Sequence, residues 1–518
     1  MTLATLLEEI DVDGVSGPTD RDVSGLCYDS RRVTPGAVFF GLAGQREDGG
    51  RYARQALEAG AAAVVVERGS AVEGQTVVEV EEPRRALAQA AARFHGHPER
   101  ALRIVGVTGT NGKTTTTWML ESIFRAAGWR AGLMGTTGVR LGEERRASTL
   151  TTPESVELFG LLGEMVARGV QGVAIEVSSH ALVQRRAFGL ACEVVVFTNL
   201  SRDHLDYHGT MEHYLDAKLM LFDGRNGRAA ERAFAIVNAD DAAAGAVIAA
   251  AERGGLRVLR YGLDLAGTAP AMALDVSVEG ATPGPGGLTL ELWAEVPKDL
   301  RARANGRPAS GAEGGEHAVR LPLLGRHNAA NAAAAFLAAV ALRIPIEAIV
   351  RGLETMPAVP GRLERVDEGQ PFLVAVDYAH TPDALERALA ACRDHGRGRV
   401  LLVFGCGGDR DRGKRPEMGR IAAAGSDLAW VTNDNPRGED PAAIAAEIVA
   451  GAGGSGLAVE LDRRRAIAQA VAAARPGDVV LIAGKGHETT QTIGAQVLPF
   501  DDRTVAREAL SAPREASG

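Results

Sequence analysis

The stretch Leu102-Arg-Ile-Val-Gly-Val-Thr-Gly-Thr-Asn-Gly-Lys-Thr114 joins an apolar run to a glycine-rich turn, and a helix-like segment follows it. Backbone N–H groups in such a turn, together with the N-terminus of the next helix, bind phosphate groups. The charge of Lys113 offsets the phosphates, and the Thr114 hydroxyl can ligate Mg²⁺. Val107 stands where the strict phosphate-loop pattern has its first glycine, so the sequence predicts a variant phosphate loop. A purely structural turn is the alternative, which the run Gly-Lys-Thr-Thr disfavours.

The residues after this loop continue the alternation of strands and helices. Strand candidates lie at 172–177, 193–198 and 233–237, and short apolar runs between helical stretches are typical of buried parallel strands. The segment 267–315 is rich in Gly, Ala and Pro and has weak periodicity, which favours an irregular, loop-rich structure. A helical, Ala-rich pattern returns at 321–342.

The last part of the chain contains four apolar runs, and each run ends in a polar cluster. The clusters are Asp377-Tyr-Ala-His-Thr-Pro382, Gly405-Cys-Gly-Gly-Asp-Arg410, Thr432-Asn-Asp-Asn-Pro-Arg437 and Gly484-Lys-Gly-His-Glu488. Ligands of open α/β sheets bind beyond the carboxyl ends of the strands. The four clusters therefore predict one composite site. The alternative, that loops are polar anyway, accounts for any single cluster better than for all four.

The sequence predicts an α/β protein of three domains, each with a sheet flanked by helices. A chain of 518 residues is too long for one core, and domains of about 150 residues would give three. Short strand and helix signals fill residues 1–98, the phosphate loop opens a central ATP-binding domain at 99–356, and the four polar clusters belong to 357–518.

Composition and charge argue against several classes of protein. The chain has 57 basic and 66 acidic residues, a net charge of −9 and no dense basic block, which disfavours binding to nucleic acid or a membrane surface. Four cysteines without C-x-x-C spacing indicate a reducing compartment. The N-terminus lacks a signal peptide's basic start, and the most apolar stretch, 329–342, is shorter than the ~20 residues of a membrane span. We expect a soluble cytoplasmic protein.

Motifs along nearly the whole chain resemble those of the Mur ligases and the related folylpolyglutamate synthases. Besides the phosphate loop, they are Asp29-Ser-Arg31, Thr151-Thr-Pro-Glu154, Glu176-Val-Ser-Ser-His180, Asp203-His-Leu-Asp-Tyr-His208, Ala217-Lys218, Gly325-Arg-His-Asn328 with Asn331, Gly361-Arg362 and the clusters beginning at Asp377 and Gly484. The resemblance implies a small uridine-nucleotide domain, a central ATPase domain and a C-terminal Rossmann-like domain. It also implies a monomeric ATP-dependent ligase of peptidoglycan synthesis.

The chemistry of such a ligase explains the residue types around the phosphate loop. An amine cannot displace a carboxylate oxygen until that oxygen is a leaving group, so ATP first forms an acyl phosphate. Phosphoryl transfer needs positioning and charge neutralisation, usually by Mg²⁺ and lysine. Lys113 and Thr114 fit these roles. The resemblance assigns Glu176 and His204 to two magnesium sites and matches Lys218 to a carbamylated lysine that acts as a ligand for the second metal. The alternative for Lys218 is a solvated helix lysine.

His204 and His208 are four residues apart, which could place both on one helix face and, alone, could suggest a zinc site. No glutamate follows His204 as in a protease motif, and no cysteine is near. A structural histidine is the better interpretation of His208.

The resemblance also assigns substrate contacts. For ATP these are Gly109, Thr110, Asn111, Gly112, Lys113, Thr114, Thr115, Asn328, Asn331, Arg362 and Asp377; for the UDP-sugar substrate they are Ser30, Thr151, Thr152, Ser178, Gln184 and Arg186. Arginine and hydroxyl groups are suitable donors to diphosphate and carboxylate oxygens. The segment Gly44-Gln-Arg-Glu47 departs from the Gly-His-Gln type of sequence expected beside the uracil, so the contacts of Gln45–Glu47 stay open.

Asp434-Asn-Pro-Arg437 resembles the signature of the family members that add meso-diaminopimelate to UDP-N-acetylmuramoyl-L-alanyl-D-glutamate. Diaminopimelate has a second carboxylate that a guanidinium can bind bidentately, whereas lysine would leave Arg437 buried and unpaired at a cost of about 3–5 kcal/mol. By resemblance the amino-acid pocket contains Arg410, Asp434, Asn435, Pro436, Arg437, Gly484 and Glu488. An ordinary Asn-Pro turn would explain the turn but not the arginine.

Two other functions compete with this interpretation. A lysine-adding ligase or a folylpolyglutamate synthase would share the phosphate loop, but Asp29-Ser-Arg31 and Arg437 argue against both. A phosphate-loop ATPase that forms no covalent product would need neither Lys218 nor an amino-acid pocket, and its phosphate release would not depend on an amine.

Overall fold

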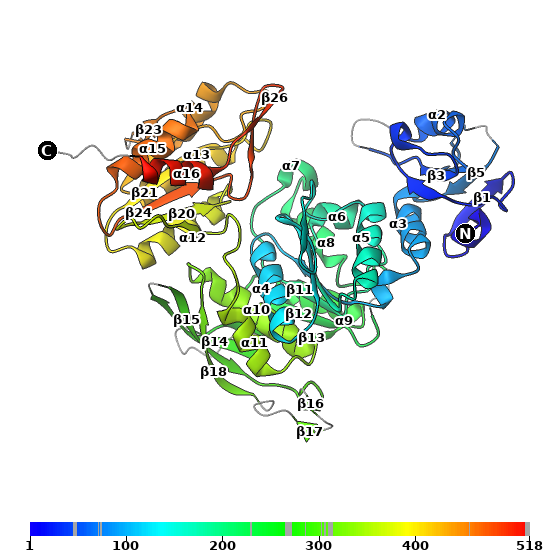
Figure 1. Ribbon diagram of the computed structural model, residues 1–518, viewed down its shortest axis with the longest axis horizontal. Coiled ribbons are helices and arrows are strands. Elements are labelled where there is room, and N and C mark those ends of the chain that lie inside the picture. Colours follow the sequence, from blue (N-terminus) through cyan, green and yellow to red (C-terminus); the bar gives the residue numbers. More distant parts are fainter. Residues whose placement is uncertain are drawn as a thin grey trace.

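The computed structural model describes residues 1–44, 49–70, 72, 75–227, 230–264, 272–284, 286–301, 303–304, 307–308, 314–454 and 456–512. The chain forms three sheet-containing units, and the middle unit lies between the other two (Figure 1). The sequence prediction of an α/β protein with several helix-flanked sheets is confirmed. The expected contacts of Gln45–Glu47 lie outside the described residues.

The first unit is built on a five-stranded sheet of order β1-β5-β4-β3-β2. Its inner strands are short apolar runs, and Val38, Phe40 and Val65 are fully buried. The elements are α1 (Leu3–Leu7), β1 (Val12–Ser16), β2 (Gly25–Cys27), η1 (Ser30–Arg32), β3 (Ala37–Phe40), η2 (Gly49–Tyr52), α2 (Ala53–Glu58), β4 (Ala63–Glu67), β5 (Val77–Val80), α3 (Pro83–Phe94) and η3 (Pro98–Arg100).

The middle unit contains an eleven-stranded sheet of order β18-β15-β14-β13-β12-β11-β6-β10-β7-β8-β9. Its strands are β6 (Arg103–Thr108), β7 (Ala131–Gly135), β8 (Gly138–Leu141), β9 (Glu144–Arg146), β10 (Gly172–Glu176), β11 (Val194–Phe197), β12 (Phe234–Asn238), β13 (Arg257–Leu263), β14 (Val276–Gly284), β15 (Gly287–Ala294) and β18 (Gly315–Leu321), and a separate pair is β16 (Arg303–Ala304) with β17 (Arg307–Pro308). The six strands from β13 to β7 are parallel. The predicted strands at 172–177, 193–198 and 233–237 are confirmed.

Helices cover both faces of this sheet. They are α4 (Lys113–Ala126), α5 (Ser155–Ala167), α6 (Ser179–Val183), α7 (Leu205–His208), α8 (Met211–Leu219), α9 (Ala244–Arg253), α10 (His327–Ala341) and α11 (Ile346–Glu354). Side chains of α4, α10 and α11 share one apolar core, and those of α5, α8 and α9 share the other. Because β6 is central, the phosphate loop after it stands in the middle of the sheet's carboxyl edge.

The expectation of an irregular structure at 267–315 is wrong for most of the part that the structure describes. β14, β15 and β18 pair antiparallel and extend the main sheet. Along β15, Leu288, Leu290 and Leu292 are buried, while Thr289 and Glu291 between them are exposed. This alternation is the period of a strand with one covered face, and the Gly and Pro residues around it obscured it in the sequence.

The third unit has a six-stranded sheet of order β19-β20-β24-β21-β22-β23. Its elements are β19 (Glu364–Val366), β20 (Leu373–Asp377), α12 (Pro382–His395), β21 (Val400–Phe404), α13 (Lys414–Gly425), β22 (Leu428–Val431), α14 (Pro441–Gly451), β23 (Ala458–Val459), α15 (Arg463–Ala473), β24 (Val479–Ala483) and α16 (Asp502–Ser511), with a hairpin of β25 (Thr490–Ile493) and β26 (Gln496–Pro499). The four strands that precede the polar clusters are neighbours and parallel, so the clusters meet at one edge.

Among the described residues, no helix combines the length and the apolar character that crossing a bilayer would require.

Candidate active site

The phosphate loop has backbone shapes that only glycine adopts easily. Gly109 has φ +148° and Gly112 has φ +87°. A Cβ at Gly109 would come within 1.9 Å of Thr198 Oγ1, and one at Gly112 within 2.4 Å of Asn331 Oδ1. The backbone N–H groups of Thr110 and Asn111 are bonded to Asn199. The glycines therefore allow β11 and α10 to approach the loop closely.

The side chain of Lys113 folds back over this loop. Its Nζ donates to the carbonyl oxygens of Gly109 at 2.8 Å and Thr110 at 2.7 Å. Desolvation lowers the pKa of Lys113, and the charge of Glu176 opposes this effect. The ammonium thus stands at the loop, within reach of a phosphate group that the loop would bind.

Glu176 ends β10 and is fully buried. Thr114 Oγ1 donates to Glu176 Oε2 at 3.0 Å, and the N–H and hydroxyl of Thr136 donate at 2.9 and 3.1 Å. Each of these partners is neutral, which leaves the charge of the carboxylate available to a cation. A carboxylate beside a threonine hydroxyl is the hard oxygen donor set that suits Mg²⁺. Arg362 Nη2 also donates to Thr114 Oγ1, at 3.1 Å.

Lys218 lies on α8 and is 1% exposed, so the alternative of a solvated lysine is wrong. Its Nζ donates to Gly109 O at 2.9 Å and lies 4.2 Å from the centre of the Tyr214 ring. Burial, with Lys113 nearby, lowers the pKa of Lys218 well below its ordinary value. A lowered pKa favours the neutral amine, which is the form that can add CO₂, so the burial of Lys218 agrees with the carbamate expectation.

His204 and His208 occupy different surroundings. His204 has φ +55° and lies 3.4 Å from Asp203, and its ring meets that of His180 edge-on at 4.8 Å. His208 is buried and shares a 2.9 Å hydrogen bond with Ser179, as expected of a structural histidine. Within the described ranges, no three His, Cys, Asp or Glu side chains form a metal-binding group.

A cavity of about 300 Å³ lies on one side of the phosphate loop. Residues of the middle and third units line it, and they include Asn111, Gly112, Thr114, Thr115, Asn238, Asp240, Tyr261, Asn331, Arg362 and Asp377. Asn331 Nδ2 donates to Asn328 Oδ1 at 2.8 Å, and Asn328 is not part of the lining. Burial raises the pKa of Asp377, and Arg362 opposes that rise.

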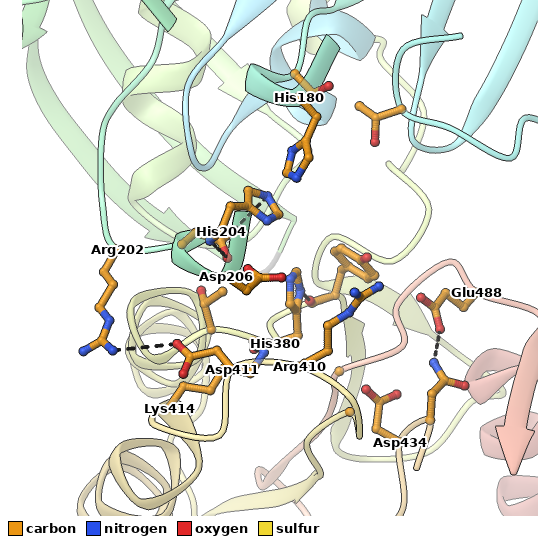
Figure 2. Close-up of a pocket in the computed structure, with 18 of the residues that line it drawn as sticks. His180, Arg202, His204, Asp206, His380, Arg410, Asp411, Lys414, Asp434 and Glu488 are labelled. Carbon is orange, nitrogen blue, oxygen red and sulfur yellow. Dashed lines mark hydrogen bonds and ion pairs between the residues drawn. The ribbon is translucent and has the colours of Figure 1, made fainter. Parts of the chain in front are cut away.

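A larger cavity, of about 600 Å³, is lined by residues of the middle and third units. Figure 2 shows His180 and His204 of the middle unit facing Arg410 and Glu488 of the third unit across it. Arg202 forms an ion pair across the same boundary with Asp411. A small cavity of about 150 Å³, which contains Lys113, Glu176 and Lys218, shares lining residues with both larger ones. The small cavity therefore lies next to both larger ones.

The residues predicted to bind the UDP-sugar are partly brought together. Thr151, Ser178 and Arg186 line the large cavity. Thr152 is fully buried and donates to Glu176 O at 2.8 Å. Gln184 Nε2 donates to Tyr207 OH, and Arg186 is bonded to Gln184. Ser30 lies on η1 of the first unit, outside the linings of the three cavities, and bonds Gln55.

The residues predicted to form the amino-acid pocket do come together. All of them except Pro436 line the large cavity. Arg437 has φ +51°, its Nη1 donates to Gly408 O at 2.8 Å, and its backbone is bonded to the β25–β26 hairpin. Asn435 Nδ2 donates to Glu488 Oε2 at 2.9 Å. Asp434 Oδ1 is buried without a hydrogen-bond partner in the described structure, as expected of an acceptor for a bound ammonium.

Several lining residues had no role assigned from the sequence. Asp203 and His380 line both the large and the small cavity. Both belong to motifs that resemble the family, Asp203–His208 and Asp377–Pro382, which could have identified them. Asp240 and Tyr261 line the 300 Å³ cavity because β12 and β13 are neighbouring strands. No local sequence pattern indicates this pairing. Lys485 does not line the cavities, but it is fully buried between the lining residues Gly484 and Glu488 and belongs to the motif Gly484–Glu488.

Comparisons with known proteins agree with this architecture. Three family models match the chain: the Mur ligase family catalytic domain at 22–95, the Mur ligase middle domain at 107–339 and the Mur ligase glutamate ligase domain at 361–486. The chain is 43% identical over 520 residues to the UDP-N-acetylmuramoyl-L-alanyl-D-glutamate–2,6-diaminopimelate ligase of Geobacillus thermodenitrificans, covering 99% of this chain and 100% of that protein.

Solved structures give the same result. A structure titled as a UDP-N-acetylmuramoyl-L-alanyl-D-glutamate–2,6-diaminopimelate ligase superposes with a TM-score of 0.67 at 33% identity, covering 98% of each chain. The MurF ligase of Thermotoga maritima, solved in complex with ADP, superposes with a TM-score of 0.59 at 19% identity, covering 90% of this chain and 94% of that one. The expected resemblance is confirmed, and the chain belongs to the Mur ligase family of ATP-dependent ligases.

Proposed function

We propose that this protein joins meso-2,6-diaminopimelate to UDP-N-acetylmuramoyl-L-alanyl-D-glutamate in peptidoglycan synthesis, at the expense of ATP. The observation that carries the proposal is that a small cavity at the phosphate loop shares lining residues with both larger cavities. One of the larger cavities is lined by Asn111, Gly112 and Thr114 of the loop, and the other is lined by Arg437 and Glu488. Relatives that share more than 40% of the sequence carry the name of this activity.

The three reactants are placed along these three cavities. ATP occupies the 300 Å³ cavity with its phosphates at Gly109–Thr115, where Lys113 offsets their charge. The UDP-sugar brings a D-glutamyl carboxylate to the junction near Thr151 and Ser178. Diaminopimelate occupies the part of the large cavity that the third unit lines. Carboxylate oxygen attacks the γ-phosphorus and ADP leaves; the amine then attacks the acyl carbon, phosphate leaves with the former carboxylate oxygen, and the amine loses a proton.

Two magnesium sites are proposed, with ligands from Thr114, Glu176, His204 and, for the second metal, a carbamylated Lys218. The fit rests on the neutral hydrogen-bond donors to the Glu176 carboxylate and on the buried amine of Lys218. Bound Mg²⁺ would neutralise charge on the transferring phosphoryl group. The carbamate forms when the neutral Nζ attacks CO₂ and releases a proton, which converts a buried cation into a carboxylate-like ligand.

The remaining assignments follow from the same proposal. Residues 1–98 form the UDP-sugar domain, 99–356 the ATP-binding domain and 357–518 the amino-acid-binding domain. The protein acts on small molecules as a cytoplasmic monomer, without nucleic acid or membrane insertion as part of its function.

One assay tests the proposal against its competitors. Phosphate release is measured with ATP and the UDP-muramoyl dipeptide, and with diaminopimelate, lysine or no amine. We expect release only with diaminopimelate. Release with lysine would instead identify a lysine-adding ligase, and release without any amine would identify an ATPase that forms no amide.

A further inference from the structure

Lys485 is a fully buried lysine that lies behind the amino-acid pocket. It follows β24, between two residues of the pocket lining, Gly484 and Glu488, but is itself absent from the lining. Its side chain is 0% exposed. Burying the charge of a lysine is costly unless the charge is paired. The groups that pair with Lys485 therefore indicate its role.

The partners of Lys485 are side chains of the pocket itself. Its Nζ lies 3.2 Å from Glu488 Oε2, 3.2 Å from Asn435 Oδ1 and 3.8 Å from Asp434 Oδ1. One ammonium therefore contacts three of the polar groups that face the cavity. Without it, the carboxylates of Asp434 and Glu488 would repel each other across a half-buried space.

Lys485 also fixes the orientation of the Asn435 amide. Asn435 Oδ1 accepts from Lys485 Nζ and from the backbone N–H of Thr492, at 2.9 Å for the latter. The amide nitrogen is thereby turned toward Glu488. Thr492 O in turn accepts from the N–H of Arg437, so the same set of bonds reaches the arginine.

We infer that Lys485 is a positioning residue for the amino-acid substrate. It holds Asn435 and Glu488 by hydrogen bonds and offsets the charge of Asp434, so that these groups can bind the distal ammonium of a diamino dicarboxylate. Lys485 lies outside the linings of the other two cavities. This inference rests on the proposed function. Residues behind a binding site that fix its first contacts commonly change ligand affinity ten- to a hundredfold, as measured at metal sites.

The test compares Lys485→Met and Lys485→Gln with wild type, each KM being measured at saturating levels of the other substrates. We expect the KM for diaminopimelate to rise about tenfold or more, and the KM values for ATP and the UDP-sugar to stay within about twofold. Lys485→Gln keeps a hydrogen-bond donor for Asn435. If Lys485→Met does not fold, the KM for diaminopimelate of Lys485→Gln tests the inference. The matched control is Lys298→Met, at an exposed lysine of the middle unit, which should behave as wild type.

A double variant separates positioning from general stability. If Lys485 acts through Glu488, then Lys485→Met combined with Glu488→Gln should raise the KM for diaminopimelate little beyond the larger single effect, within about threefold. An unchanged KM for diaminopimelate, an equal rise for all three substrates or a multiplicative double effect would overturn the inference. Failure of the wild type to use diaminopimelate would instead overturn the proposed function.

Discussion

Asn111 of the phosphate loop donates from Nδ2 to Asp383 Oδ2 of α12 at 2.7 Å, so a side chain of the loop is bonded directly to the third unit. Ser201 Oγ donates to the same carboxylate oxygen at 3.2 Å, and Arg387 holds the other oxygen. The position of the third unit and the shape of the loop are therefore coupled through Asp383.

Asp383→Ala should impair ATP use because it releases this contact. We expect the KM for ATP to rise about tenfold, the effect of losing hydrogen bonds to a charged group. Asp394→Ala is the control, since Asp394 stands near the other end of α12 and pairs with Arg326. Steady-state kinetics check the prediction, and an Asp383→Ala enzyme with the ATP dependence of wild type would refute it.

Lys113→Ala should abolish ligation. The ammonium at the loop would be lost, and the transferring phosphoryl group would be left under-neutralised. The measurement is phosphate release with all three substrates at saturation. Turnover above about a tenth of wild type, a loss below ~1.4 kcal/mol, would contradict the assignment.

Sequence reasoning predicted the elements whose signals are local. The phosphate loop, the parallel strands and the four polar clusters each depend on a short run of residues, and the runs at 400–404, 428–431 and 479–483 match β21, β22 and β24 residue for residue. Resemblance to a family added the roles of distant motifs, such as Glu176. The buried position of Glu176 beside Thr114 agrees with a role in binding Mg²⁺, and that role stays a prediction.

What the sequence did not predict depends on long-range packing. The local sequence around Lys218 favours a solvated lysine on a helix. It does not indicate that Tyr214 and the phosphate loop cover the side chain. The 276–294 hairpin was hidden by Gly and Pro that interrupt its alternation. Lys485 was quoted as part of a motif, yet its partners Asn435 and Asp434 come from another strand end.

Lys218→Ala should be nearly inactive and partly rescued by added short carboxylates. The proposed role of Lys218 is to carry a carbamate, and a small carboxylate can enter the space left by the side chain to supply the missing oxygens. Activity is measured against acetate or propionate concentration, with Lys113→Ala, which carboxylates should not rescue, as the control. An unmodified ammonium at Lys218 in a crystal with ATP and Mg²⁺ would refute the carbamate.

The buried ion pair of Arg463 and Asp502 should matter for stability. Both side chains are 0% exposed and lie 2.7 Å apart, and Arg463 also donates to the carbonyls of Asn433 and Ala483. Asp502→Ala would leave the guanidinium buried and unpaired, which costs about 3–5 kcal/mol. Glu508→Ala, which breaks the exposed pair with Arg464 between the same two helices, should cost less than about 1 kcal/mol. Denaturant unfolding measures both; equal losses would contradict the prediction.

Arg437 should determine the choice of amino acid. Its guanidinium lines the large cavity, where its only hydrogen bond among the described residues is to the carbonyl of Gly408, and four further N–H groups remain for a ligand. A distal carboxylate on the substrate would bind there bidentately. Lysine has no such carboxylate, and a site built to bond a missing polar group can discriminate by about 10⁴-fold.

Replacing Arg437 by Ala or Asn should therefore collapse this selectivity. Use of diaminopimelate should fall sharply, because its distal carboxylate would be desolvated without a partner. Use of lysine should fall much less, or rise, since no unpaired cation remains in the pocket. The KM for ATP should stay near that of wild type, because Arg437 lies outside the nucleotide cavity. The kcat/KM for each amine, measured in wild type and variants, gives the ratio. If wild type prefers lysine, or if both amines lose equally in Arg437→Ala, the pocket assignment is wrong, although the ligase activity itself would stand.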